Sequence, residues 1–86
     1  MSTLTALGID VAKRTLAVAG VSGTDVMLER NIPNTFEGIE KFLDALRRTY
    51  GDLTGLPCVV EATGGYHLPI ATMFARSGCS VKVVNP

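Results

Sequence analysis

The sequence predicts one small α/β domain with a mixed β-sheet and helices packed on its faces. Three observations lead to this prediction. Short apolar segments of strand length fill the first third of the chain, and the hydrophobic period then changes to that of a helix. Two further apolar segments follow, separated by a second helical pattern. An antiparallel meander continued by right-handed β-α-β crossovers gives the element order β-β-β-α-β-α-β.

The first third of the chain predicts three antiparallel strands. Residues 5–11 are apolar on both faces, which is typical of a central strand covered on both sides. A polar break at residues 12–14 precedes a second strand at residues 16–21. Gly23 is suited to the next turn because it tolerates positive φ. Residues 26–32 have the mixed polarity of an edge strand.

The next segment predicts an amphipathic helix. Asn34 is the expected N-cap, with Glu37 placed to reach back to it. Arg47 and Arg48 suit the negative end of the helix dipole, and Gly51 is a plausible stop. The apolar residues that follow helical spacing are Phe36, Ile39, Phe42, Leu43, Leu46 and Tyr50.

The last third predicts a strand, a helix and a strand. Residues 57–62 form a short apolar run, and a glycine-rich turn then leads into a helix with Pro69 in its first turn. That helix is expected to end at residues 77–78, and residues 80–84 form the fifth strand. Three residues four apart are expected on one helix face: Tyr66, Ile70 and Phe74.

The composition is that of a folded domain. The chain has 86 residues, of which 47% are hydrophobic and 19% charged. Its mean hydropathy of +0.30 indicates a surface normally covered by further chain or by a partner. The sequence has neither an apolar run of roughly 20 residues nor the layout of a secretory signal, so a cytoplasmic location and no membrane association are predicted.

Charge and cysteine content restrict the possible functions. Lys+Arg and Asp+Glu are both 8, so composition alone gives no support for nucleic-acid binding, which must rest on local features. Cys58 and Cys79 do not have the spacing of a metal site. They are predicted to be reduced thiols that serve as small apolar residues, with a disulfide as the alternative.

Two acids stand where buried strands are expected to end. Asp10 closes one apolar run and Glu61 closes another, just before a glycine-rich loop. If the two strands are parallel neighbours, both carboxylates lie at the carboxyl ends of adjacent central strands, where open α/β sheets bind ligands. Burying two adjacent carboxylates is unfavourable, and a divalent cation such as Mg²⁺ or Mn²⁺ removes that cost. We therefore predict a metal site at Asp10 and Glu61.

Structural roles remain open for both acids. Asp10 can instead cap a turn or pair with Lys13 or Arg14. Glu61 can face water or meet the N-terminus of the second helix. Lys13 and Arg14 are candidates for holding a phosphate backbone beside the site, and the alternative is that they are simply solvated.

The segment Thr63–Gly64–Gly65–Tyr66 is a candidate for nucleic-acid binding. Main-chain N–H groups of a glycine turn that enters a helix attract anions, and the alternative is a tight structural connection. Tyr66 can stack on a base or pack in the core. His67 is expected at the surface or at the helix start and is not assigned as a base.

Four motifs occur in the order and spacing of one protein family. They are "GIDVAK" at 8–13, "NT" with "GIEKFL" within 34–43, "VVEATGGYH" at 59–67 and "GCSVKVVNP" at 78–86. The chain resembles, over essentially its whole length, the N-terminal catalytic domain of the DEDD-type transposases of bacterial insertion sequences. These are recombinases associated with insertion guided by a bridge RNA.

The resemblance implies a fold similar to that of ribonuclease H and the Holliday-junction resolvases. Four acids bind Mg²⁺ in this family; Asp10 matches the first and Glu61 the second. The other two are aspartates downstream of the "NP" motif. Residues 1–86 are therefore expected to be the N-terminal part of the catalytic domain, with a sheet incomplete at its C-terminal side and no strand cleavage or joining on their own. DNA, a guide RNA, a homo-oligomeric partner and a bacterial cytoplasmic location are implied as well.

Two other functions remain as alternatives. An ATP-binding domain of the sugar-kinase and actin type also has "GID" on its first strand, but Ala12–Lys13 stands here in place of the usual glycine and threonine. A domain without catalysis that only dimerises or binds a partner is the second alternative, which the zero net charge favours mildly.

Overall fold

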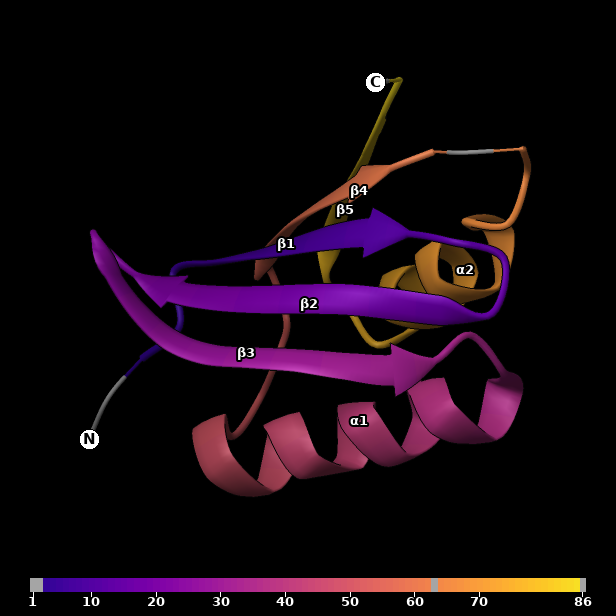
Figure 1. The fold of residues 1–86 in the computed structure, drawn as a ribbon. Helices are drawn as coiled ribbons and strands as arrows, with labels where there is room; N and C mark the ends of the chain where they lie inside the picture. The colour runs from indigo at the N-terminus through magenta and orange to yellow at the C-terminus, as the bar shows by residue number, and fades with distance from the viewer. Residues whose placement is uncertain (1–2, 63, 86) are drawn as a thin grey trace.

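The computed structural model describes residues 3–62 and 64–85 and confirms the predicted α/β class. Five strands and two helices follow one another in the predicted order (Figure 1). The elements are β1 (Ala6–Val11), β2 (Thr15–Ser22), β3 (Asp25–Pro33), α1 (Phe36–Tyr50), β4 (Pro57–Glu61), α2 (Leu68–Arg76) and β5 (Ser80–Val84).

One mixed sheet contains all of these strands, in the order β3-β2-β1-β4-β5. The pairs β1/β2 and β2/β3 are antiparallel, whereas β1/β4 and β4/β5 are parallel. The meander, the edge position of β3 and the parallel pairing of β4 beside β1 are therefore confirmed. This arrangement is that of a ribonuclease-H-like fold, as the resemblance implies.

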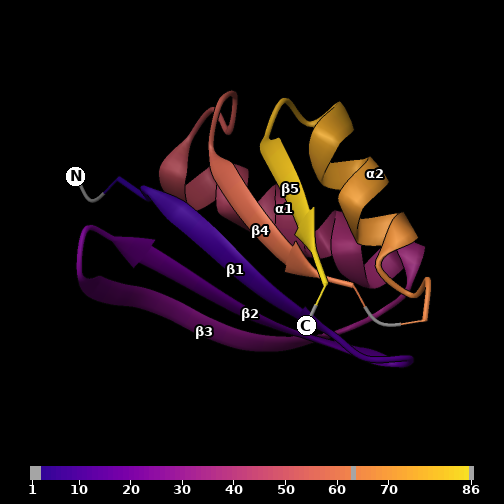
Figure 2. The same cartoon turned by 90° about the horizontal axis from the view of Figure 1, so that it is seen from above.

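Both helices cover the same face of the sheet (Figure 2). Leu7, Ile9 and Val11 point to this face and are buried, whereas Gly8 and Asp10 alternate with them and are exposed on the other face. The predictions that helices pack on both faces and that the first strand is covered on both sides are wrong for the described residues. The strand looked two-sided in the sequence because Gly8 and the alanines of its neighbour β2 are small rather than polar.

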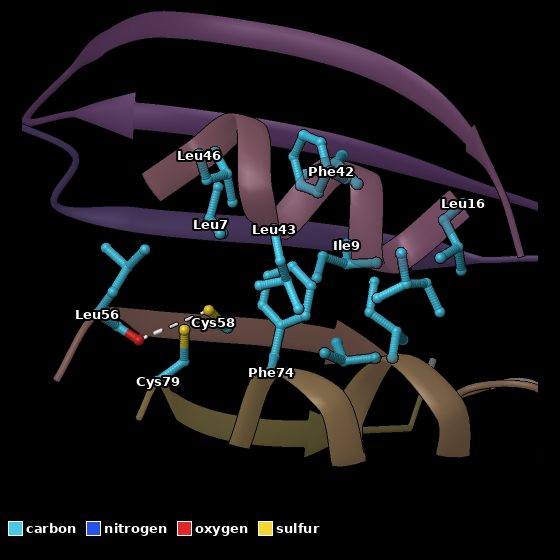
Figure 3. Packing of buried hydrophobic residues seen from close by; sticks show 14 of the residues in the cluster. Leu7, Ile9, Leu16, Phe42, Leu43, Leu46, Leu56, Cys58, Phe74 and Cys79 are labelled. Atoms are coloured by element: carbon cyan, nitrogen blue, oxygen red, sulfur yellow. Dashed lines mark hydrogen bonds between the residues drawn. The ribbon is translucent and has the colours of Figure 1, made fainter. Parts of the chain in front are cut away.

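The core lies between the helices and the covered face of the sheet (Figure 3). Phe42 of α1 and Phe74 of α2 stack with ring centroids 6.3 Å apart, so the two helices also pack against each other. Ile70 and Phe74 are completely buried. Burial of each such side chain contributes about 1.5–3 kcal/mol, so this layer stabilises the register of the central strands beneath it.

The two cysteines are buried and free, as predicted. Cys58 lies on β4 and Cys79 just before β5, and the Cys58 thiol lies 3.6 Å from the main-chain oxygen of Leu56 (Figure 3). Burial raises the pKa of both thiols above the ordinary range. Both side chains therefore serve as protonated, apolar core residues.

The N-terminus of α1 differs from the prediction by one residue. Thr35 is the N-cap, and its Oγ1 accepts a hydrogen bond of 3.0 Å from the Gly38 N–H. Asn34 does not cap the helix because its side chain binds two loop carbonyls. The predicted return contact of Glu37 is also absent among the described residues. The predicted features at the other end are present: Arg47 and Arg48 lie in the last turn, and Gly51 is the C-cap with φ 80°.

The segment before α2 corrects a second prediction. The helix begins at Leu68, so Tyr66 precedes it and is 40% exposed instead of sharing the buried face of Ile70 and Phe74. His67 is the N-cap residue, which confirms its expected place at the helix start. Tyr66 is consequently available for contacts outside the core.

Gly38→Ala is expected to destabilise the domain. An alanine usually stabilises a helix interior by about 1 kcal/mol relative to glycine. Here, however, a Cβ at this position would lie 2.6 Å from the main-chain oxygen of Pro33. We expect a loss of about 1–3 kcal/mol in the free energy of unfolding, measured by urea denaturation. Glu40→Ala, an exposed change on the same helix, should stay within about 0.5 kcal/mol. A higher free energy of unfolding in Gly38→Ala would contradict the expected clash between a Cβ at this position and the main-chain oxygen of Pro33.

The buried thiols predict a fall in stability at alkaline pH. The raised pKa of Cys58 means that above about pH 8.5 the unfolded chain releases a thiol proton that the folded chain retains. The stabilisation is therefore complete below that pH and is lost as pH rises, at up to about 1.4 kcal/mol per pH unit. Unfolding curves between pH 8 and 10 measure the slope. Cys58→Ala should be less stable at pH 7, but its free energy of unfolding should fall less steeply with pH. Equal slopes in the variant and the original protein would show that the Cys58 thiol is not responsible.

Candidate metal centre

Asp10 and Glu61 are direct neighbours across the parallel pair β1/β4. Their Cα atoms are register partners, at the last pair of a ladder that starts at Leu7 and Cys58. Adjacent strands lie about 4.8 Å apart, and side chains at paired positions project from the same face of a sheet. Both acids are therefore on the open face, at the carboxyl ends of central strands.

Neither carboxylate is buried in the structure. Asp10 and Glu61 are both exposed because they fall on the face that the helices leave uncovered. The expectation that the two carboxylates are buried is therefore wrong for the described residues. What remains is the adjacency of two like charges at paired positions of a sheet, which is itself unfavourable.

Within residues 3–62 and 64–85, neither carboxylate has a protein partner. No hydrogen bond or ion pair joins Asp10 or Glu61 to another side chain in this part of the structure; the ion pair found there is that of Arg47 with Asp44, at 3.4 Å. The alternatives in which Asp10 pairs with Lys13 or Arg14 are therefore not observed. Both carboxylates are left free to bind a ligand from outside.

An open hollow of about 790 Å³ lies over this part of the sheet. Asp10 and Glu61 are among the residues that line it, together with the small residues Gly8, Ala17 and Ala19. Glu29 and Asn31 of β3 also line it, although neither was a candidate site residue from the sequence. The residues that line it are Gly8, Ile9, Asp10, Ala17, Val18, Ala19, Glu29, Arg30, Asn31, Val59, Glu61 and Val84.

Asn31 belongs to the same row of the sheet as the two acids. It is paired with Ala17, which is paired with Asp10, which is paired with Glu61. Strand alternation in the sequence shows which face of β3 Asn31 occupies. Only the register between the strands shows that it lies in line with Asp10 and Glu61.

The predicted nucleic-acid contacts lie at the same end of the sheet. Lys13 and Arg14 are exposed in the turn that directly follows β1. Gly64 and Gly65 follow β4 and have positive φ values of 58° and 82°, which few other residues adopt. Tyr66 is 40% exposed beside them, and Thr63 lies outside the described residues.

The donor chemistry fits a hard divalent cation. Mg²⁺ in proteins is usually bound by one or two carboxylates, with water and substrate phosphate as further ligands. Asp10 and Glu61 provide two such oxygen donors side by side. No group of three or more His, Cys, Asp or Glu side chains with metal-site geometry occurs in the described part of the chain.

The ribonuclease-H-like sheet carries the two acids at the carboxyl ends of its adjacent strands β1 and β4. The family model described as "Transposase", that of the DEDD transposases of the IS110 type, matches residues 7–86. The chain belongs to this DEDD transposase family. It is a transposase domain, of a family that acts on DNA and generally uses divalent metal ions, and this favours the recombinase interpretation over an ATP-binding domain.

No curated protein matches the chain at a significant level. Neither helix in residues 3–62 and 64–85 has the length and apolar character needed to cross a membrane.

Removing one of the two adjacent charges is expected to stabilise the metal-free domain. Asp10→Asn keeps the shape of the side chain and eliminates the like-charge pair with Glu61. We expect the free energy of unfolding in EDTA to rise by about 0.2–1 kcal/mol, the scale of a cross-strand charge effect. Asp25→Asn, an exposed change at the start of β3, is the control and should have no effect. A clear loss of stability in Asp10→Asn would mean that the carboxylate has a structural partner.

Proposed function

We propose that this chain is the N-terminal part of the catalytic domain of a DEDD transposase, in which Asp10 and Glu61 supply two of four acidic ligands for Mg²⁺ or Mn²⁺. The observation that carries this proposal is the register pairing of the two acids on the open face of the sheet. Their lack of protein partners among the described residues and their match to the family's first two acids both support it.

The strands give the site its rigidity. Asp10 is flanked on β1 by the buried residues Ile9 and Val11, and Glu61 follows the fully buried Val60 on β4. The core therefore fixes the main chain under both carboxylates, and no loop has to become ordered before they bind a ligand. A bound divalent cation would neutralise phosphate charge and orient the attacking oxygen atom during strand cleavage and joining.

The adjoining loops are proposed to hold the DNA backbone. Lys13 and Arg14 are exposed cations directly after β1, and Gly64 and Gly65 allow main-chain N–H groups to approach a phosphate closely. Tyr66 is exposed and suited to stack on a base. Thr63 directly precedes Gly64 in the sequence, and we include it in the proposed DNA contact because it is part of the "VVEATGGYH" motif.

The resemblance extends the proposal to the whole protein. It implies a guide RNA and a homo-oligomer as partners and the bacterial cytoplasm as the location. It also implies two further aspartates that complete the metal site, so residues 1–86 alone are expected to be inactive in strand cleavage and joining.

Isosteric variants of the two acids test the proposed function. In the intact transposase, Asp10→Asn and Glu61→Gln should each reduce Mg²⁺-dependent DNA strand cleavage by about 100-fold or more, the scale of losing one preorganised electrostatic contact. Both should also weaken Mn²⁺ binding in a calorimetric titration. Glu40→Gln, on the exposed side of α1, is the matched charge control and should retain full activity.

The two readouts separate the possible failures. Unchanged Mn²⁺ affinity and cleavage in both variants would refute the metal role. Reduced cleavage with unchanged Mn²⁺ affinity would assign the acids to DNA contact instead of metal binding.

A further inference from the structure

Asn34 joins three segments that are far apart in the sequence. It stands between β3 and α1, and its main-chain N–H donates a hydrogen bond of 2.8 Å to the Arg14 carbonyl. Its side-chain nitrogen Nδ2 donates to two further carbonyl oxygens, those of Ala12 and Tyr66, each at 3.0 Å. The turn after β1 and the loop after β4 are therefore bound to one residue.

These contacts are placed at the two loops beside the candidate site. Ala12 and Arg14 enclose Lys13, so two of the three hydrogen bonds fix the turn on either side of that cation. The third fixes the main chain of Tyr66, directly after Gly64 and Gly65. The main chain of these loops is thereby held relative to the ends of β1 and β4, which carry Asp10 and Glu61.

The amide group is specifically required by this geometry. Both side-chain contacts use the NH₂ group as donor, and the acceptors are main-chain carbonyls that have no alternative protonation state. The other side-chain atom, Oδ1, is buried and has no hydrogen-bond donor among the described residues. An aspartate has the same shape, but it would direct a carboxylate oxygen at the two carbonyls and lose both hydrogen bonds.

We propose that Asn34 is a positioning residue for DNA binding. It holds the turn of residues 12–14 and the loop segment of residues 64–67 as one preformed surface, so that Lys13, Arg14 and Tyr66 meet the DNA together. The proposal rests on the proposed function of these loops in DNA contact. It adds a residue that touches neither the metal nor the DNA and acts through the main chain of both loops.

Asn34→Asp in the intact transposase tests the proposal. We expect amide hydrogen exchange at Ala12 and Leu68, whose N–H groups donate within the two loops, to become at least about tenfold faster while strand amides keep their protection. The Kd for substrate DNA should rise at least about fivefold because the contacts must be ordered on binding. Asn34→Ala removes the donors without adding charge and should give the same two changes, so it replaces Asn34→Asp if that variant does not fold.

Thr35→Ala is the matched control. It removes the adjacent N-cap bond to Gly38 and destabilises α1, but it leaves all three Asn34 contacts in place. It should increase exchange at the Gly38 amide without loosening the loops or weakening DNA binding. Equal loss of DNA affinity in Thr35→Ala would show that general destabilisation, and not positioning, is responsible.

The remaining outcomes are also decisive. Unchanged loop exchange in Asn34→Asp would overturn the proposal, and so would faster exchange with unchanged DNA affinity. If Asn34→Asp loosens the loops and weakens DNA binding while Asp10→Asn leaves Mn²⁺ affinity intact, the metal role fails and the positioning role stands.

Discussion

The parallel pairing of β1 with β4 is the interaction on which the rest of this structure depends. Its register runs from Leu7 with Cys58 to Asp10 with Glu61. Because side chains alternate along a strand, the same register sends Leu7 and Cys58 into the core and the two acids to the open face. A slip of β4 by one residue would turn its open face to the helices and place Glu61 against them. Burial of the apolar set therefore also determines the geometry of the candidate metal centre.

The hydrophobic core and the candidate metal centre lie on opposite faces of the sheet. The buried hydrophobic side chains of the described residues form one core cluster, in which Phe42 and Phe74 join α1 to α2. The open face carries two adjacent acids that have no protein partner among the described residues. Such a like-charge pair lowers the stability of the domain. Burial of apolar side chains on the other face offsets this cost. This division is expected where a sheet has to present ligands to a metal and a nucleic acid.

Local patterns predicted the elements well, and long-range contacts account for what they missed. The order of the elements along the chain and the adjacency of Asp10 and Glu61 followed from hydrophobic period and from the rules for β-α-β connections. The burial of the acids was wrong because the sequence does not state how many helices lie on each face. Tyr66 was misplaced because it lies four residues before Ile70, as a helical residue would, but the helix begins only at Leu68. The role of Asn34 depends on main-chain carbonyls in two distant loops, for which no side-chain pattern exists.

The most direct test of the central claim is paramagnetic broadening by Mn²⁺ in the NMR spectrum of the amide groups. If Asp10 and Glu61 bind the cation, sub-stoichiometric Mn²⁺ should broaden the amides of residues 10–11 and 61–62 first and leave those near Gly23 and Gly55 sharp. Asp10→Asn should abolish this local effect. Broadening centred on another acidic residue, or unchanged broadening in Asp10→Asn, would contradict the assignment of the metal centre to the end of the β1/β4 pair.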